Sequence, residues 1–142
     1  MKCTVHIQDE REEVVVYAKE NSPLIEKIKR LAEADSFVLI GSKEDQLCRV
    51  DPQTVDCFVI QNGKTEAVTQ DGVWRVKQRL YQLEDLLADS FIKINQSCLV
   101  NRHAIVRFKA TLGGALQVVL NSGYTDYVSR RQLKEVKERM GL

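Results

Sequence analysis

Apolar and polar positions alternate along most of the chain with the two-residue period of β-strands. Runs of this kind predict strands at residues 2–8, 13–18, 37–40, 46–50, 55–60, 66–69, 73–76, 91–94, 105–111, 115–120 and 124–128. The pair Asn62-Gly63 lies between two of them and predicts a tight hairpin, because asparagine and glycine accept the positive φ angles of such turns. We therefore expect a mainly β (α+β) fold.

In three segments the apolar residues are instead spaced three or four positions apart, as on one face of an α-helix. The first follows Asn21-Ser22-Pro23, a typical helix start. The second covers about residues 77–88, where leucines share one face, and we expect it to pack on the sheets. The third begins with a capping-box pattern, Ser129 followed by Gln132, and ends at Gly141. Its apolar side consists of Leu133, Val136 and Met140.

These elements divide the chain into two parts. Residues 1–36 form a small β-β-α extension, and residues 37–142 form the main domain. A unit of about 36 residues is too small to be stably folded alone, so it should dock on the remainder of the chain or on a second copy. We favour docking as a packing extension, since such small units seldom have the area of a dimerisation domain.

Charge is distributed unevenly between the two ends of the chain. The net charge is +1, but residues 90–142 hold nine Lys and Arg against three acidic residues, and the first 89 hold 12 against 17. Such asymmetry suggests that the C-terminal end faces a polyanion.

Hydrogen-bonding side chains are concentrated in residues 91–109. This stretch contains Asn95, Gln96, Ser97, Asn101, Arg102 and His103, with further cations at Lys93, Arg107 and Lys109. Amides can bond to base edges and cations can pair with phosphates, so the stretch predicts a nucleic-acid contact. The alternative is a polar loop whose amides cap turns.

Two arginines, Arg130 and Arg131, occupy the first turn of the third helix, where the helix dipole disfavours cations. A functional role and simple exposure to water explain them equally well.

Other classes of function lack their sequence signals. No catalytic motif is present, and Cys98 and His103 have no orienting group that would make them a nucleophile and base. The four cysteines are widely spaced and lack a C-x-x-C, so we expect isolated thiols, no metal site and no cofactor. With no signal peptide and no apolar run long enough to span a bilayer, the protein is expected to be cytoplasmic.

Residues 37–142 resemble the LytTR DNA-binding domain of bacterial transcription regulators. Four segments carry the resemblance: TVDCFVIQNGK, TQDGVWRVKQRLYQLEDLL, SFIKINQSCLVNRHAI and NSGYTDYVSRRQLKEVK. The third has an aromatic residue, a polar triplet ending in serine, and then apolar residues before asparagine. The fourth has a serine-arginine pair before the closing helix.

The resemblance implies an elongated β-sheet domain, with short covering and C-terminal helices, that binds DNA through loops. Carried over by position, the base-contact candidates are Gln96 and Arg131, followed by Asn95 and Lys64. The backbone-contact candidates are Asn62, Lys93, Ser97, Asn101, Arg102, His103 and Arg130. Many members have histidine at the position of Asn95, and the first loop, around Asn62 to Thr65, is variable. Direct base contact in that loop is therefore the weakest transfer.

A LytTR domain implies a sequence-specific regulator that binds paired direct repeats of double-stranded promoter DNA as a homodimer, with no small-molecule substrate. Because no receiver domain precedes it in this sequence, the chain resembles stand-alone, response-regulator-like LytTR proteins. Some of these are restrained by a small membrane protein, and we expect such a partner rather than phosphorylation.

The alternative function is a protein-interaction or ligand-sensing β-domain whose basic face binds an acidic partner. RNA binding ranks third, since exposed aromatic residues are not interleaved with the basic segments.

Overall fold

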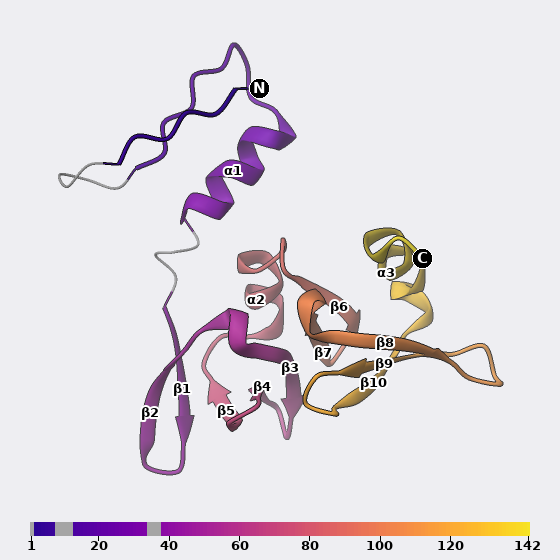
Figure 1. Ribbon diagram of the computed structural model, residues 1–142. Coiled ribbons are helices and arrows are strands. Elements are labelled where there is room, and N and C mark those ends of the chain that lie inside the picture. Colours follow the sequence, from indigo (N-terminus) through magenta and orange to yellow (C-terminus); the bar gives the residue numbers. More distant parts are fainter. Residues whose placement is uncertain (1, 8–12, 34–37) are drawn as a thin grey trace. The chain divides into compact units, whose positions relative to one another are not determined.

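A computed structural model describes residues 2–7, 13–33 and 38–142. The chain divides into two compact units, residues 1–37 and residues 38–142, which we call unit 1 and unit 2. Figure 1 labels their helices and strands in chain order.

In the described part of unit 1, residues 2–7 and 13–33, one regular element is present, the helix α1 (Pro23–Glu33). It starts as expected, with the Glu26 amide bonded to Ser22 O (3.1 Å) and the Ile25 amide to Ser22 Oγ (3.3 Å). The predicted strands were wrong, because residues 2–7 and 13–18 form no strand. All residues of these two segments are exposed, whereas a strand is stabilised by packing one face on other residues. Gln8 and the charged turn at residues 9–12 lie outside the described residues.

Unit 2 consists mainly of antiparallel strands arranged in two sheets. The larger sheet has the order β2-β1-β5-β4-β3-β7-β6, and the smaller one β10-β9-β8. The strands of the larger sheet are β1 (Leu39–Lys43), β2 (Gln46–Val50), β3 (Val55–Gln61), β4 (Lys64–Thr69), β5 (Gly72–Val76), β6 (Phe91–Asn95) and β7 (Cys98–Asn101). Those of the smaller are β8 (Ile105–Ala110), β9 (Leu116–Leu120) and β10 (Thr125–Val128). The expected mainly β fold is confirmed.

Both faces of the larger sheet are covered at strands β3, β7 and β6. On one face lies α2 (Leu80–Leu86), with Leu83 buried and with Phe58 and Phe91 in ring contact beneath it at 5.2 Å. The other face packs against β8–β10 and α3 (Arg130–Met140) around a core that includes Ile92 and Val136. Because β3 and β7 are buried on both faces, they are mostly apolar on both sides rather than alternating.

In the ranges that the structure describes, no helix is both long and apolar enough to cross a membrane.

Several strand boundaries differ from the prediction by one to three residues, strand β7 was not predicted, and two differences matter for the fold. β1 continues through Gly41 to Lys43, beyond the predicted end at residue 40. A Cβ at Gly41 would lie 2.7 Å from Trp74 Cβ and from Val50 Cγ2. Glycine is therefore required by close packing and not by a turn. The polar stretch at residues 91–109 is also not continuous, since the buried strand β7 divides it into a turn before the strand and a 3-10 turn, η3 (Arg102–Ala104), after it.

Candidate nucleic-acid interface

Three segments of unit 2 meet at one end of the larger sheet. They are residues 62–64 between β3 and β4, residues 95–97 at the turn between β6 and β7, and residues 129–131 at the start of α3. We call these nine residues the loop edge. It contains all four base-contact candidates that the sequence analysis gave.

Backbone hydrogen bonds hold the three segments together. The Ile60 amide donates to Ser97 O at 3.0 Å, which joins the end of β3 to the β6–β7 turn. The Ser129 amide donates to Ile94 O at 2.8 Å, which joins the start of α3 to the same turn from the other side. The turn at residues 95–97 is therefore the centre of the loop edge.

The hairpin at one side of the loop edge has the predicted geometry. Asn62 and Gly63 have φ angles of 52° and 73°, and Gln61 pairs with Lys64 to close the turn. Positive φ at both central residues is the condition for the tight turns that suit twisted hairpins. Asn62, Gly63 and Lys64 are all exposed, and no atom lies within 4 Å of a Cβ built at Gly63. The tip is thus open to a ligand.

Asn95 holds the central turn in place with both ends of its amide. Its Oδ1 accepts from the Ser97 amide at 2.8 Å, and its Nδ2 donates to Tyr127 O in β10 at 2.9 Å. Gln96, between these residues, is exposed. Asn95 therefore stabilises the loop edge through both ends of its amide, and Gln96 is the exposed amide of the turn. The bond to Ser97 is a local asparagine turn that sequence could suggest, whereas the bond to Tyr127 spans 32 residues.

We expect Asn95→Ala to lower the free energy of unfolding by about 1–3 kcal/mol, because two hydrogen bonds of about 0.5–1.5 kcal/mol each are lost. Urea denaturation of the variant and the native chain measures this difference. The matched control is Gln96→Ala, an exposed amide in the same turn, which should change stability by less than about 0.5 kcal/mol. Equal changes in the free energy of unfolding for the two substitutions would show that the Asn95 side chain does not stabilise the loop edge.

The start of α3 forms the other side of the loop edge. Ser129 is the residue that precedes the helix, but its side chain makes no capping hydrogen bond, so the predicted capping box was wrong. The backbone of Ser129 is instead used to reach Ile94 O. Arg130 and Arg131 are exposed in the first turn. Tyr127, just before them, is 51% exposed and was missed by the sequence analysis, although the alternation in β10 places it outward.

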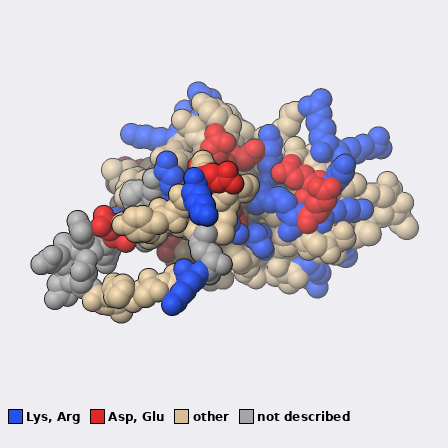
Figure 2. Space-filling view, turned by 90° about the horizontal axis from the view of Figure 1, so that it is seen from above, with Lys and Arg blue, Asp and Glu red and all other residues tan. Residues whose placement is uncertain are grey.

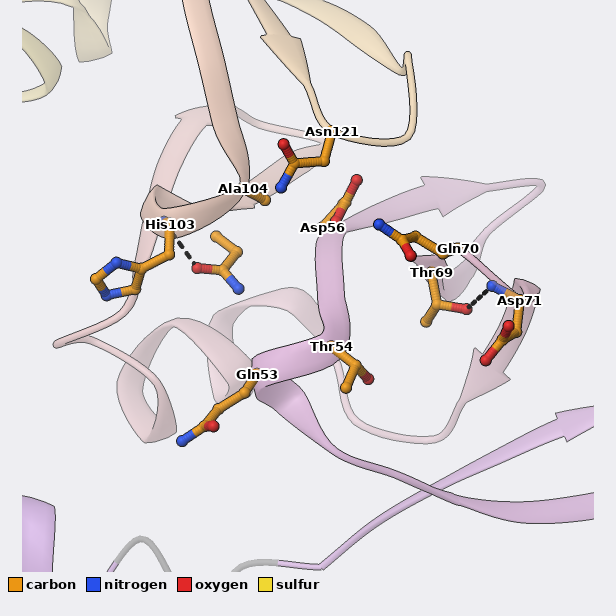
Figure 3. Close-up of a pocket in the computed structure, with 10 residues that line it drawn as sticks. Gln53, Thr54, Asp56, Thr69, Gln70, Asp71, His103, Ala104 and Asn121 are labelled. Atoms are coloured by element: carbon orange, nitrogen blue, oxygen red, sulfur yellow. Dashed lines mark hydrogen bonds between the residues drawn. The ribbon is translucent and has the colours of Figure 1, made fainter.

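Asn101 is a correction to the predicted backbone contacts. It is only 3% exposed at the far end of β7, where its Nδ2 donates to Val55 O (3.0 Å) and its Oδ1 accepts from the His103 amide (3.0 Å). Figure 3 shows the second of these bonds. With both ends of its amide bonded inside the protein and its side chain buried, Asn101 holds the η3 turn and does not face the solvent from which a phosphate would approach.

The other predicted backbone contacts lie at different places. Ser97 belongs to the loop edge, and Lys93 is half-buried in the middle of β6. Arg102 and His103 are exposed in η3, which is separated from residues 95–97 by the whole of β7. At about 3.4 Å per residue, five residues of strand place Arg102 roughly 17 Å from Ser97.

A polar cavity of about 300 Å³ lies near that far end (Figure 3). It is lined by Gln53, Thr54, Asp56, Thr69, Gln70, Asp71, Asn101, His103, Ala104 and Asn121. Asp56 is 5% exposed and accepts from the Ser122 amide at 2.8 Å, which ties β3 to the β9–β10 turn. Across the described ranges, no three His, Cys, Asp or Glu side chains gather as metal ligands do.

Two of the cysteines contact each other, which the prediction of isolated thiols did not foresee. Cys57 and Cys98 are both buried on neighbouring strands, and their hydrogen bond, followed by burial, raises the pKa of Cys98 far above its ordinary value. Cys98 is thus a neutral thiol at physiological pH. It lies at the start of β7 and His103 beyond its end, so they do not form a nucleophile and base.

Surface charge alone does not mark an interface. Figure 2 shows Lys and Arg side chains spread over the visible face, with groups of acidic side chains between them. The distinguishing feature of the loop edge is that Lys64, Gln96 and Arg131 are exposed on segments fixed to one another by hydrogen bonds.

Comparisons with known proteins identify the domain. Residues 45–141 match the model of the LytTr DNA-binding domain. Two Staphylococcus aureus proteins, from strains NCTC 8325 and MRSA252, are 31% identical over 107 residues, which are 75% of this chain and 73% of theirs. Both are named uncharacterized HTH-type transcriptional regulators.

A solved LytTr DNA-binding domain from Bacillus cereus has the same fold. It superposes with a TM-score of 0.69 at 22% identity, over 74% of this chain and 97% of that domain. The family match covers most of unit 2, and the family resemblance predicted from sequence is confirmed. The chain belongs to the LytTR family of DNA-binding domains.

Proposed function

We propose that this chain is a transcriptional regulator that binds double-stranded DNA in a sequence-specific manner through the loop edge. The family match and the regulator names of the Staphylococcus aureus relatives support this function. The observation that carries it is the loop edge itself, where exposed Lys64, Gln96 and Arg131 project from segments joined by backbone hydrogen bonds. In this role the protein is not an enzyme and acts in the cytoplasm, where promoter DNA lies.

Gln96 and Arg131 are the proposed base readers. A glutamine amide can bond in bidentate fashion to adenine, and an arginine guanidinium to guanine. Both residues are exposed, whereas Asn95 has its amide engaged inside the protein. Among the described residues, β1–β5 separate α1 from α2 and β6–β10 separate α2 from α3, so these helices form no helix-turn-helix pair. DNA is read here instead by loops and the first turn of α3.

The remaining exposed or half-buried candidates are proposed to contact phosphates: Asn62, Lys93, Ser97, Arg102, His103 and Arg130. About five such contacts give a slope of roughly −4 to −5 in a plot of log affinity against log salt concentration. We expect Lys93→Ala to weaken binding to all sequences alike and to bring the slope about one unit closer to zero.

Fluorescence anisotropy with labelled duplexes at several salt concentrations measures both quantities. The control is Lys43→Ala. The Nζ atom of Lys43 lies 5.8 Å from the centroid of the Trp74 ring and close to Gly72. Gly72 pairs with Thr69, which is at the opposite end of β4 from Lys64. The role of Lys93 is ruled out if its variant has the same slope as the native chain.

Two copies are proposed to act together on paired direct repeats. A single loop edge offers few base readers, and each correct bidentate contact contributes about 1–3 kcal/mol of discrimination. Doubling the number of contacts is the simple way to reach the specificity of a regulator.

The decisive experiment is the selection of a random double-stranded DNA library on the purified protein at about 150 mM salt, near physiological ionic strength. Enrichment of two short repeats, spaced by about one or two helical turns, supports the proposal. Binding without any enriched motif, fading steadily as salt rises, leaves only non-specific electrostatic attraction. That outcome favours the second candidate, an interaction module whose basic end binds an acidic protein.

A further inference from the structure

The smaller sheet of unit 2 has one face toward the core and one toward solvent. On β8 the core side is marked by Phe108, which pairs with the buried Val118 and packs against the core cluster. Successive side chains of a strand point to opposite faces, so Arg107 and Lys109 lie on the solvent side. Both are exposed. The outer face of the smaller sheet therefore carries two cations on one strand.

Strand pairing extends this outer face across all three strands. Lys109 pairs with Gln117 of β9, and Gln117 pairs with Tyr127 of β10, which is 51% exposed. Arg107 lies in the next row, where its neighbours on β9 and β10 are uncharged. We call Arg107, Lys109, Gln117 and Tyr127 the basic face. From the spacing of residues along a strand and of strands in a sheet, it measures roughly 7 by 10 Å.

Acidic side chains are absent from the basic face. The structure describes all of β8, β9 and β10, and the one acid on these strands is Asp126. It pairs with the buried Val118 and its carboxylate contacts the Cys98 thiol, so it points toward the core. The cations on the outer face therefore have uncharged neighbours across the sheet, and the potential there is positive. Arg, Lys, Gln and Tyr side chains are all donors that proteins use to bind phosphate oxygens.

The basic face is fixed to the loop edge. Asn95 Nδ2 donates to Tyr127 O at 2.9 Å, which joins β10 to the central turn of the loop edge. β10 then leads through Ser129 into the first turn of α3, which contains Arg131 (Figure 1). The basic face therefore continues the loop edge on its Arg131 side, away from the hairpin at residues 62–64.

We propose that the basic face binds phosphates of the same duplex, beyond the base pairs that the loop edge reads and on the Arg131 side of them. This inference rests on the proposed function. Each DNA strand carries one phosphate per 3.4 Å of helix axis, so a face of this size meets about two or three phosphates. Continuity with the loop edge favours DNA over an acidic protein as the partner, because a duplex held by one surface necessarily passes the other.

The test uses three duplexes that contain one selected repeat. One is short, and the others are extended by about six base pairs, or roughly 20 Å, at one end or the other. Fluorescence anisotropy at several salt concentrations measures the affinity and its salt slope. For the native chain we expect tighter binding and a slope steeper by about two units when the extension lies next to the base pair that Arg131 reads. Extension at the other end should change little.

The double variant Arg107→Ala with Lys109→Ala should lose this gain in affinity and slope while keeping its base preference, since phosphate contacts carry no sequence information. The matched control is Lys77→Ala with Arg79→Ala. It also removes two exposed cations, from the segment that leads into α2, and α2 covers the face of the larger sheet opposite the smaller sheet. The control should keep the gain. Circular dichroism checks that both variants are folded.

Three results would overturn the proposal. The first is a native chain that gains nothing from an extension at either end. The second is a double variant that keeps the full gain; loss of its binding to poly-L-glutamate would then assign the basic face to an acidic protein. The third is an equal loss of the gain in the control, which would mean that net charge and not this face is responsible.

Failure of the proposed function would give a different result. In that case the native chain binds duplexes of the same lengths without any base preference. If the double variant still brings the salt slope about two units closer to zero than the control does, the basic face binds DNA phosphates although the loop edge reads no sequence.

Discussion

Replacing Arg131 with alanine is expected to weaken binding of the preferred DNA sequence by about 5- to 150-fold, which corresponds to roughly 1–3 kcal/mol for a lost bidentate base contact. The preference at one base pair should be lost at the same time, because the same guanidinium supplies affinity and discrimination. Arg131 is exposed on the first turn of α3, and the Ser129 amide fixes that turn to Ile94 O at 2.8 Å. Anisotropy titrations with the selected repeat and its single-base variants measure both effects.

Lys137→Ala is the matched control for Arg131. It removes one positive charge from an exposed position on the same helix, six residues or about 9 Å further along its axis. We expect a change in affinity of less than about twofold, since long-range attraction between exposed charges is screened by salt. If Arg131→Ala lowers affinity equally for every base variant, Arg131 is a phosphate contact rather than a base reader.

Replacing Phe58 with alanine is expected to lower the free energy of unfolding by about 3–5 kcal/mol, the usual range for a fully buried phenylalanine. Its side chain is 0% exposed in β3, with its ring 5.2 Å from that of Phe91 in β6. The substitution leaves a cavity between the sheet and α2 and removes this ring contact. Urea denaturation followed by circular dichroism measures the loss.

Tyr81→Ala is the control for Phe58. It removes an aromatic ring from α2 at a position that is 65% exposed, and should cost less than about 1 kcal/mol. A loss for Phe58→Ala as small as that for Tyr81→Ala would mean that the α2 face of the sheet is not a packed core.

Features set by local chemistry were predictable from the sequence. The Asn62-Gly63 hairpin, the start of α1 after Ser22, and the end of α3 at Gly141 with its φ of 71° all follow from residues within one turn of each other. Most strands of unit 2 were found in the same way, because alternation or a short apolar run is readable wherever a sheet face is buried.

Features set by distant contacts were not predictable. Asn101 looked like its polar neighbours in sequence, and only its bond to Val55 O, 46 residues away, makes it structural. Ser129 had the pattern of a capping residue, but its position is set by its backbone bond to Ile94 O. Residues 2–7 and 13–18 had strand composition, and composition alone does not provide the surface that a strand must pack on.

The way in which the loop edge is held together bears on how such a regulator changes its target over evolution. Its fixing bonds run between main-chain groups, through Ile60, Ser97, Ser129 and Ile94, or through Asn95. The side chains at positions 64, 96 and 131 take part in none of them. These three positions can therefore be exchanged at little cost to folding. Under the proposed function, related proteins can acquire new operators in this way while keeping one scaffold.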